Sequence, residues 1–231
     1  MRRRHSFAGV TAAVGAAVGA AAAAYVLLVR PWHLRWGATG QESGGTLPGD
    51  DLVANPDLMA TRAITVGAPA DEVWPWIAQL GQGRGGFYSY DLLENLIGCE
   101  IHSADRIVPE WQMVAVGDEV RLHPEVPLVV AAVDPGRALV LRGGVPMGDT
   151  PPPYDFTWAF ALQEQPDGTT RLLVRERYAY AQWWSAVLVE AVEAVSFVMS
   201  QKMLRGLRNR AEGTGMLRPL PRTDDVGGGD S

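Results

Sequence analysis

The amino-acid sequence predicts an α+β domain in which a curved antiparallel sheet wraps around a long C-terminal helix. The helix is expected over residues 183–211. As far as Met199 this run is apolar on nearly every side, with only Glu190 and Glu193 charged, so most of its faces have to be covered. The sheet is predicted from short apolar runs in the middle of the chain, which Pro and Gly residues separate. Because a strand and two helices come first and the long helix last, the helix is expected to lie across the sheet.

The other elements follow in order along the chain. Residues 62–66 are expected to form the first strand, which Gly67-Ala68-Pro69 ends. A helix is expected over residues 70–80, with acidic residues near its positive N-terminal end. A second, shorter helix is expected over residues 90–97. Further short strands are expected at residues 120–122, 128–133 and 138–141.

Two strands with a clear two-residue period close the sheet. On the first, one face carries Tyr154, Phe156, Trp158, Phe160 and Leu162. On the returning strand, one face carries Leu172, Val174, Glu176, Tyr178 and Tyr180, and the other carries Arg171, Leu173, Arg175 and Arg177. The apolar face of this hairpin is therefore expected to line the interior, with one carboxylate among its side chains.

The chain of 231 residues has room for one ordinary domain and a tether. Residues 1–36 are predicted to be a membrane anchor with its flanks, and residues 37–57 a flexible linker rich in Gly, Pro, Asp and Ser. The folded domain is expected over residues 58–212. Residues 213–231 are expected to form a disordered tail.

The predicted transmembrane helix is Phe7–Val29, 23 residues without a charge and roughly 34 Å long as a helix, which is enough to cross a membrane. Three arginines precede the span and two follow it closely, which favours a single-pass protein with its body on the extracytoplasmic side. The alternative is a signal peptide cleaved near the alanines at 22–24. Cleavage is disfavoured because the most apolar residues, 25–29, come after that site.

Composition excludes several classes of function. The net charge is −6, and the five arginines before Gly37 leave the rest of the chain with fifteen basic and twenty-six acidic side chains. So acidic a body is a poor partner for nucleic acid. One cysteine, Cys99, allows no intramolecular disulfide, and the four histidines have no metal-ligand spacing, so neither a metal nor another cofactor is expected. Residues 81–86 match G-x-G-x-x-G, but they follow a predicted helix instead of a strand, so a dinucleotide site is not expected.

Three segments resemble a known superfamily. Residues 64–77 read Ile-Thr-Val-Gly-Ala-Pro-Ala-Asp-Glu-Val-Trp-Pro-Trp-Ile, and residues 86–95 and 101–112 continue the likeness. Over about residues 58–212 the chain resembles the START-related helix-grip superfamily (SRPBCC, polyketide cyclase/dehydrase-like), in a bacterial, membrane-anchored branch. The resemblance implies a helix-grip fold. It also implies a hydrophobic ligand, since members bind lipids, sterols, hormones or polyketides, and some are enzymes.

Glu176 is the first candidate for a functional residue, because an ionised carboxylate on an apolar face is costly unless it is paired. It is expected either to orient a ligand or move a proton, or to be a structural acid paired with an arginine such as Arg142. A second set is dense in polar and aromatic groups and forms either the mouth of a pocket or a loop held by its own ion pairs, for example Asp105 or Glu94 with Arg106. The predicted ligand-binding residues are Tyr88, Tyr90, Asp91, His102, Arg106, Trp111, Phe156, Trp158, Glu176 and Tyr178.

Three functions follow from these observations. The first is a membrane-anchored binding domain for a hydrophobic small molecule, such as a lipid, polyketide or isoprenoid. The second is a cyclase- or dehydratase-like enzyme on the same pocket, with Glu176 or His102 as base and Tyr88 or Tyr90 as proton donor. The third is a non-catalytic interaction module near the membrane, with a filled core.

Overall fold

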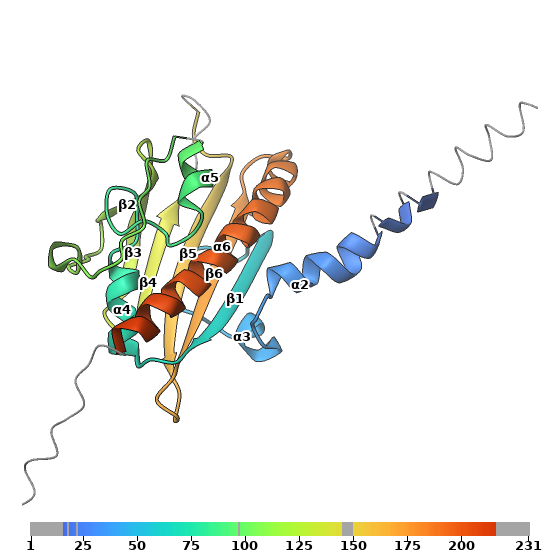
Figure 1. Ribbon diagram of the computed structural model, residues 1–231. Coiled ribbons are helices and arrows are strands. Elements are labelled where there is room, and N and C mark those ends of the chain that lie inside the picture. Colours follow the sequence, from blue (N-terminus) through green and yellow to red (C-terminus); the bar gives the residue numbers. More distant parts are fainter. Residues whose placement is uncertain (1–15, 18, 22, 97, 145–149, 216–231) are drawn as a thin grey trace, which may run out of the picture.

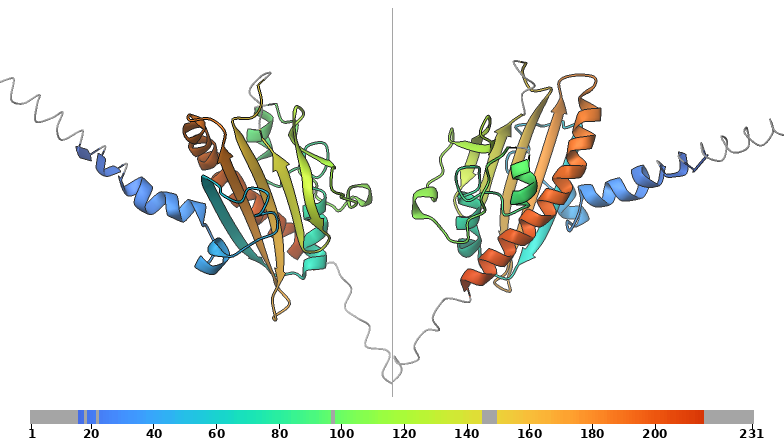
Figure 2. Two further views of the ribbon diagram at one scale, coloured as in Figure 1. Left: turned by 180° about the vertical axis from the view of Figure 1, so that it is seen from behind. Right: turned by 45° about the horizontal axis from the view of Figure 1, so that its top comes forward.

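The computed structural model describes residues 16–215 except 18, 22, 97 and 145–149 (Figure 1). Its body is one antiparallel sheet of six strands in the order β1-β6-β5-β4-β3-β2. The strands are β1 (Leu58–Val66), β2 (Glu119–His123), β3 (Val126–Asp134), β4 (Ala138–Gly143), β5 (Tyr154–Glu164) and β6 (Thr170–Tyr180). The long helix α6 (Ser185–Gly215) runs across one face of the sheet, which confirms the α+β prediction (Figure 2).

Shorter helices lie between β1 and β2 on the same face as α6. They are α4 (Ala70–Ala78), α5 (Asp91–Leu96) and the single turn η2 (Pro109–Trp111). The helices predicted over residues 70–80 and 90–97 are thus confirmed, each one or two residues shorter at its ends. At the N-terminus, η1 (Tyr25–Val29) runs into α2 (Arg30–Leu34), and α3 (Gly40–Gly44) follows.

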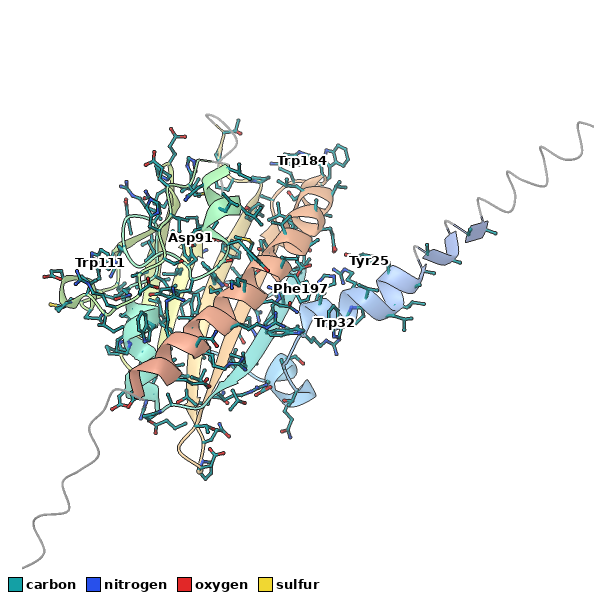
Figure 3. The ribbon with its side chains drawn as sticks, viewed as in Figure 1. Tyr25, Trp32, Asp91, Trp111, Trp184 and Phe197 are labelled. Atoms are coloured by element: carbon teal, nitrogen blue, oxygen red, sulfur yellow. The ribbon has the colours of Figure 1, made fainter. Side chains whose placement is uncertain are left out.

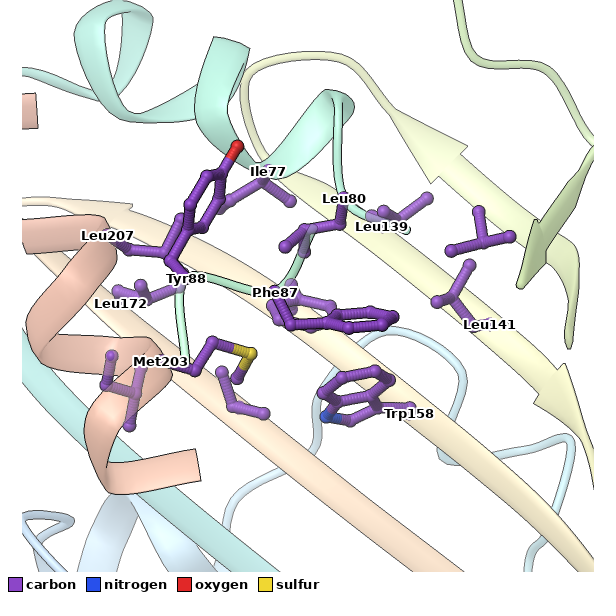
Figure 4. Packing of buried hydrophobic residues seen from close by; sticks show 14 of the residues in the cluster. Ile77, Leu80, Phe87, Tyr88, Leu139, Leu141, Trp158, Leu172, Met203 and Leu207 are labelled. Carbon is purple, nitrogen blue, oxygen red and sulfur yellow. The ribbon is translucent and has the colours of Figure 1, made fainter. Parts of the chain in front are cut away.

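The alternation predicted for the last two strands is confirmed. β5 and β6 pair in a register that sets Trp158 opposite Glu176 and Phe156 opposite Tyr178. These four side chains are buried and point to the side covered by α6. Apolar side chains from α4, the following loop, β4 and α6 complete the core (Figure 4).

α6 approaches the loop before α5 very closely at one glycine. A Cβ on Gly206 would lie 2.3 Å from the carbonyl oxygen of Tyr88, so only glycine allows this contact. Tyr88 itself has a φ of 56°, a left-handed conformation that costs energy for a residue with a side chain. The contact fixes the loop that leads into α5.

Residues 37–57 differ from the prediction of a flexible linker. They contain α3, which begins with a capping box between Thr39 and Glu42, and their apolar side chains Leu47 and Val53 are buried. Arg175 of β6 donates to the carbonyl oxygens of Gly45 and Glu42, both at 2.8 Å, and to Asp50 at 2.6 Å. The linker prediction is therefore wrong: this segment, here called the strap, is held on the outer face of the sheet by arginines of β6.

About half of the predicted transmembrane segment, Phe7–Val29, lies outside the described residues. Over the part of the chain that is described, no helix is long and apolar enough to cross a membrane. The described end of the segment, η1, projects from the body with Leu27 and Leu28 about 70% exposed (Figure 1). At the other end of the chain, α6 continues to Gly215, and the rest of the predicted tail lies outside the described residues.

Candidate functional site

Two adjoining chambers lie between α6 and the concave face of the sheet, with volumes of about 190 and 170 Å³. Together they are called the interior cavity here. Leu122, Trp158 and Ser196 line both chambers and form the waist between them. The larger chamber is also lined by Leu128, Gly144, Tyr154, Phe156, Glu176, Tyr178 and Val192. The smaller is also lined by Phe87, Ser89, Glu94, Ile101, Met199, Ser200 and Met203, and the stacking of Phe87 on Trp158 is visible in Figure 4.

Glu176 lies at the wall of the larger chamber and is fully hydrogen-bonded. Its carboxylate accepts from Arg62 at 2.9 Å, from the hydroxyl of Ser196 at 2.8 and 2.9 Å, and from Tyr178 at 3.1 Å. Burial and the negative charge of Glu176 raise the pKa of Tyr178 well above its usual range, so the phenol keeps its proton and donates. Of the two roles predicted for Glu176, the geometry favours the structural ion pair.

The partner of Glu176 is Arg62 and not the predicted Arg142. Arg142 lies on the exposed outer face, where it pairs with Asp155 at 2.6 Å. Arg62 is buried because it occupies an inward position on β1, the strand next to β6. The guanidinium of Arg62 therefore reaches the interior from a neighbouring strand, and no local pattern in the sequence predicts its pairing with Glu176.

A second carboxylate meets the same arginine. Glu193 of α6 is fully buried and contacts Arg62, and its other oxygen lies 2.8 Å from Nδ1 of His33 on α2. Burial raises the pKa of Glu193 to about 7, with the positive charge of Arg62 opposing the shift. Burial also lowers the pKa of His33, and the positive charge of Arg62 lowers it further. The contact between Glu193 and His33 joins α2 to α6.

Two side chains that line the smaller chamber each carry a buried polar atom with no hydrogen-bond partner among the described residues. The two atoms are Nε1 of Trp158, a donor, and Oε2 of Glu94, an acceptor. The Glu94 side chain comes from α5 and is 7% exposed. Burial raises the pKa of Glu94 to about 7, and the nearby negative charge of Asp91 adds to the shift. Native proteins leave few buried polar groups unpaired, so these two atoms are candidates for contact with a polar group of a ligand.

The predicted cluster from residue 88 to residue 111 is mostly a loop bonded to itself. Tyr88 is buried, accepts from Gln79 at 3.0 Å, and donates to the carbonyl of Trp76 at 3.1 Å. Asp91 accepts two bonds from Ser103, at 2.6 and 2.7 Å.

The other members of that cluster point away from the interior. His102 and Arg106 are exposed, and Tyr90 is 40% exposed with its ring 5.8 Å from the ammonium of Lys202. Asp105 pairs with Arg210 instead of Arg106. The six predicted residues Tyr88, Tyr90, Asp91, His102, Arg106 and Trp111 line neither chamber, whereas Phe156, Trp158, Glu176 and Tyr178 do.

Several residues of the site were not predicted from the sequence. Ser196 and Ser200 both bond Glu176, and with Glu193 they follow the spacing of three and four residues that places side chains on one helix face. That spacing was a usable signal for a polar stripe in an otherwise apolar helix. Nothing local marked Arg62 as their partner, because the contact joins segments more than a hundred residues apart.

No protein-family model matches the chain, and no curated protein matches it. Solved structures do resemble it. One is a protein from Nitrosospira multiformis, at 14% identity over 69% of this chain and 99% of that chain, with a TM-score of 0.45. Another is the Zhui aromatase/cyclase from Streptomyces sp. R1128, at 17% identity over 67% and 93%, with a TM-score of 0.39. A third is a Polyketide_cyc-like protein from Corynebacterium glutamicum, at 13% identity over 68% and 92%, with a TM-score of 0.39.

The sheet order and the position of α6 are those that the resemblance in the sequence implies. The fold is a helix-grip fold. Two of these solved structures are described as an aromatase/cyclase and as a Polyketide_cyc-like protein. Their identities and TM-scores are too low to bear on what this chain binds.

Proposed function

We propose that this chain is a membrane-tethered binding domain for a hydrophobic small molecule, such as a lipid, polyketide or isoprenoid. The observation that carries the proposal is the interior cavity, which has mostly apolar walls and a few convergent polar groups. Burial of ligand hydrocarbon would stabilise the complex by about 25 cal/mol per Å². The polar groups at the waist and at the two ends would orient the ligand.

The proposal is tested by native mass spectrometry of the full-length chain, purified from its own host in lipid nanodiscs, followed by extraction and identification of what is bound. A discrete apolar molecule that co-purifies in stoichiometric amount supports the binding function. Retention of only the bulk lipids of the nanodisc, with no stabilisation by a panel of lipids and polyketides, would favour the filled-core interaction module instead.

A matched pair of variants locates the binding site. Leu122→Trp adds a large ring at the waist that both chambers share, so it should abolish co-purification. Leu92→Trp makes the same change on the exposed side of α5, at a residue that lines neither chamber, and should leave the bound molecule in place. Equal amounts of bound molecule in the two variants would show that the interior cavity is not the binding site.

We also propose that the segment Phe7–Val29 anchors the chain in a membrane with the body on the extracytoplasmic side. Apolar side chains exposed on the described end of this segment support it, as do the exposed side chains of Trp183, just before α6, and of Val187 and Val195 on α6. These surfaces adjoin, since Trp32 packs against Phe197 of α6 with ring centroids 5.2 Å apart (Figure 3). A bilayer would cover both. Extraction of the chain from membranes by alkaline carbonate would count against the anchor. Protection of its body from protease in intact cells would count against the extracytoplasmic orientation.

A cyclase- or dehydratase-like activity is the second candidate, and one observation favours it. Glu94 lines the cavity with a pKa of about 7, so it could either give or take a proton near neutral pH. His102 and Tyr90, expected from the sequence to do this, are exposed outside the chambers. Turnover of a linear polyketide that disappears in Glu94→Gln would support this candidate, whereas turnover that survives the substitution would exclude Glu94 from it.

A further inference from the structure

We infer that the smaller chamber binds the hydroxyl group of an alcohol or phenol, between Oε2 of Glu94 and Nε1 of Trp158. This inference rests on the proposed binding function and specifies the chemistry of the ligand. Both atoms are buried, both belong to side chains that line the same chamber, and neither has a hydrogen-bond partner among the described residues.

The two atoms are complementary. The indole N–H can only donate, and the Glu94 carboxylate, once it is ionised above a pH of about 7, can only accept. A hydroxyl group both donates and accepts, so a single hydroxyl placed within reach of both atoms would satisfy the two together. An ether or a ketone would leave the ionised carboxylate unpaired, and an amine cation would leave the indole N–H unpaired.

The other polar groups of the chamber are already engaged. The hydroxyl of Ser89 donates to the carbonyl of Met199 at 3.1 Å, and the hydroxyls of Ser196 and Ser200 donate to Glu176. The remaining walls are apolar, among them Phe87, Ile101 and Met203. The chamber thus offers one hydroxyl site in an apolar pocket.

The size of the chamber fits a small ring. Its volume of about 170 Å³ slightly exceeds that of an engineered cavity of about 150 Å³ that binds benzene. A phenol ring or a short hydroxylated chain therefore fills the smaller chamber, and the rest of a longer ligand continues through the waist at Ser196 into the larger one. The ligand class is a hydrophobic molecule with a terminal hydroxyl.

The test compares three probes of nearly equal shape: 4-propylphenol, 4-propylanisole and propylbenzene. Each is titrated into the full-length chain in lipid nanodiscs, and binding is followed by the NMR resonance of the Trp158 indole N–H, assigned with Trp158→Phe. The phenol should bind about ten-fold or more tightly than either other probe, since a hydrogen bond to a buried charged group is worth about that factor. It should also shift the indole resonance downfield.

Glu94→Leu should remove this preference, and Glu94→Gln, which keeps an acceptor oxygen in the same shape, should keep part of it. Glu110→Gln changes an exposed carboxylate and should bind like the wild type, and it also corrects for partition of the probes into lipid. If all three probes bind the wild type equally, the hydroxyl site is refuted and the binding function stands. If none of them perturbs the chamber at concentrations that saturate the nanodiscs, both proposals fail.

Discussion

The burial of Glu94 makes the free energy of unfolding of the protein depend on pH in a specific way. Its pKa rises from 4.5 to about 7 on folding, because burial and the charge of Asp91 disfavour the ionised form. An acid with a raised pKa binds its proton more tightly when folded, so its contribution favours the fold at low pH and is lost as pH rises through about 7. At about 1.4 kcal/mol for each pH unit the whole effect is about 3.4 kcal/mol, of which about 2 kcal/mol falls between pH 5.5 and pH 8.

Glu94→Gln removes this term and keeps the shape of the side chain. At pH 5.5 the free energy of unfolding of the variant should lie within about 1.5 kcal/mol of that of the wild type. Between pH 5.5 and pH 8 the difference should shift by about 2 kcal/mol in favour of the variant. Thermal unfolding of the full-length chain in nanodiscs, freed of bound small molecules, would show this gain as a relative rise in Tm of about 4–8 °C.

The comparison of the two proteins cancels the contribution of Glu193, whose pKa of about 7 also lies in this range. Glu110→Gln, at an exposed site, should follow the wild type at both pH values. If Glu94→Gln lost stability with pH as steeply as the wild type, Glu94 would not be ionising in a buried site, and the physical basis of the hydroxyl site would be lost.

Three further substitutions test the packing around the site. Arg62→Met should cost about 3–5 kcal/mol in a urea titration, because it leaves two buried carboxylates without their cation; a loss under 1 kcal/mol would mean that the cluster is hydrated. Tyr178→Phe should cost about 1–2 kcal/mol by the same measurement, since it removes one donor to a buried carboxylate, and no loss would mean that the bond is not formed. Arg175→Ala should release residues 37–57 to limited proteolysis while the exposed Arg121→Ala does not, and equal resistance in both would show that the strap is held by its apolar contacts alone.

The elements that could be predicted from the sequence are those whose pattern is local. The two-residue period of β5 and β6 and the apolar character of α6 each depend on neighbouring residues, and both survive in the structure. The inward position of Glu176 followed directly from that period. Its cation did not, because Arg62 lies on a strand that becomes a neighbour of β6 only when the sheet closes.

Contacts between segments that are distant in the sequence also explain why the structures of the strap and of the loop before α5 were not predicted. Residues 37–57 have the composition of a linker, and they are ordered by arginines more than a hundred residues away. In the loop, the residue types fit either a pocket mouth or a loop held by its own ion pairs, and composition does not decide between the two. The structure uses Tyr88 and Asp91 to fix the loop and turns the neighbouring Glu94 inward. Composition alone does not say which of several nearby carboxylates faces the interior.

The strap also determines how the domain would move if its N-terminus is held in a bilayer. From Arg30 to Asp57 the chain is fastened repeatedly to the body, at Glu190, Glu193, Arg171 and Arg175. Such a connection is rigid and not flexible, because no segment between Arg30 and Asp57 is free of contacts with the body over a length that would let the body rotate. The domain would keep one tilt and one stand-off distance above the lipid headgroups, so any opening of the cavity would always face the same depth of the membrane. Its exchange of ligand with the bilayer would then be limited by local opening of the fold, and not by the diffusional search of a tethered domain.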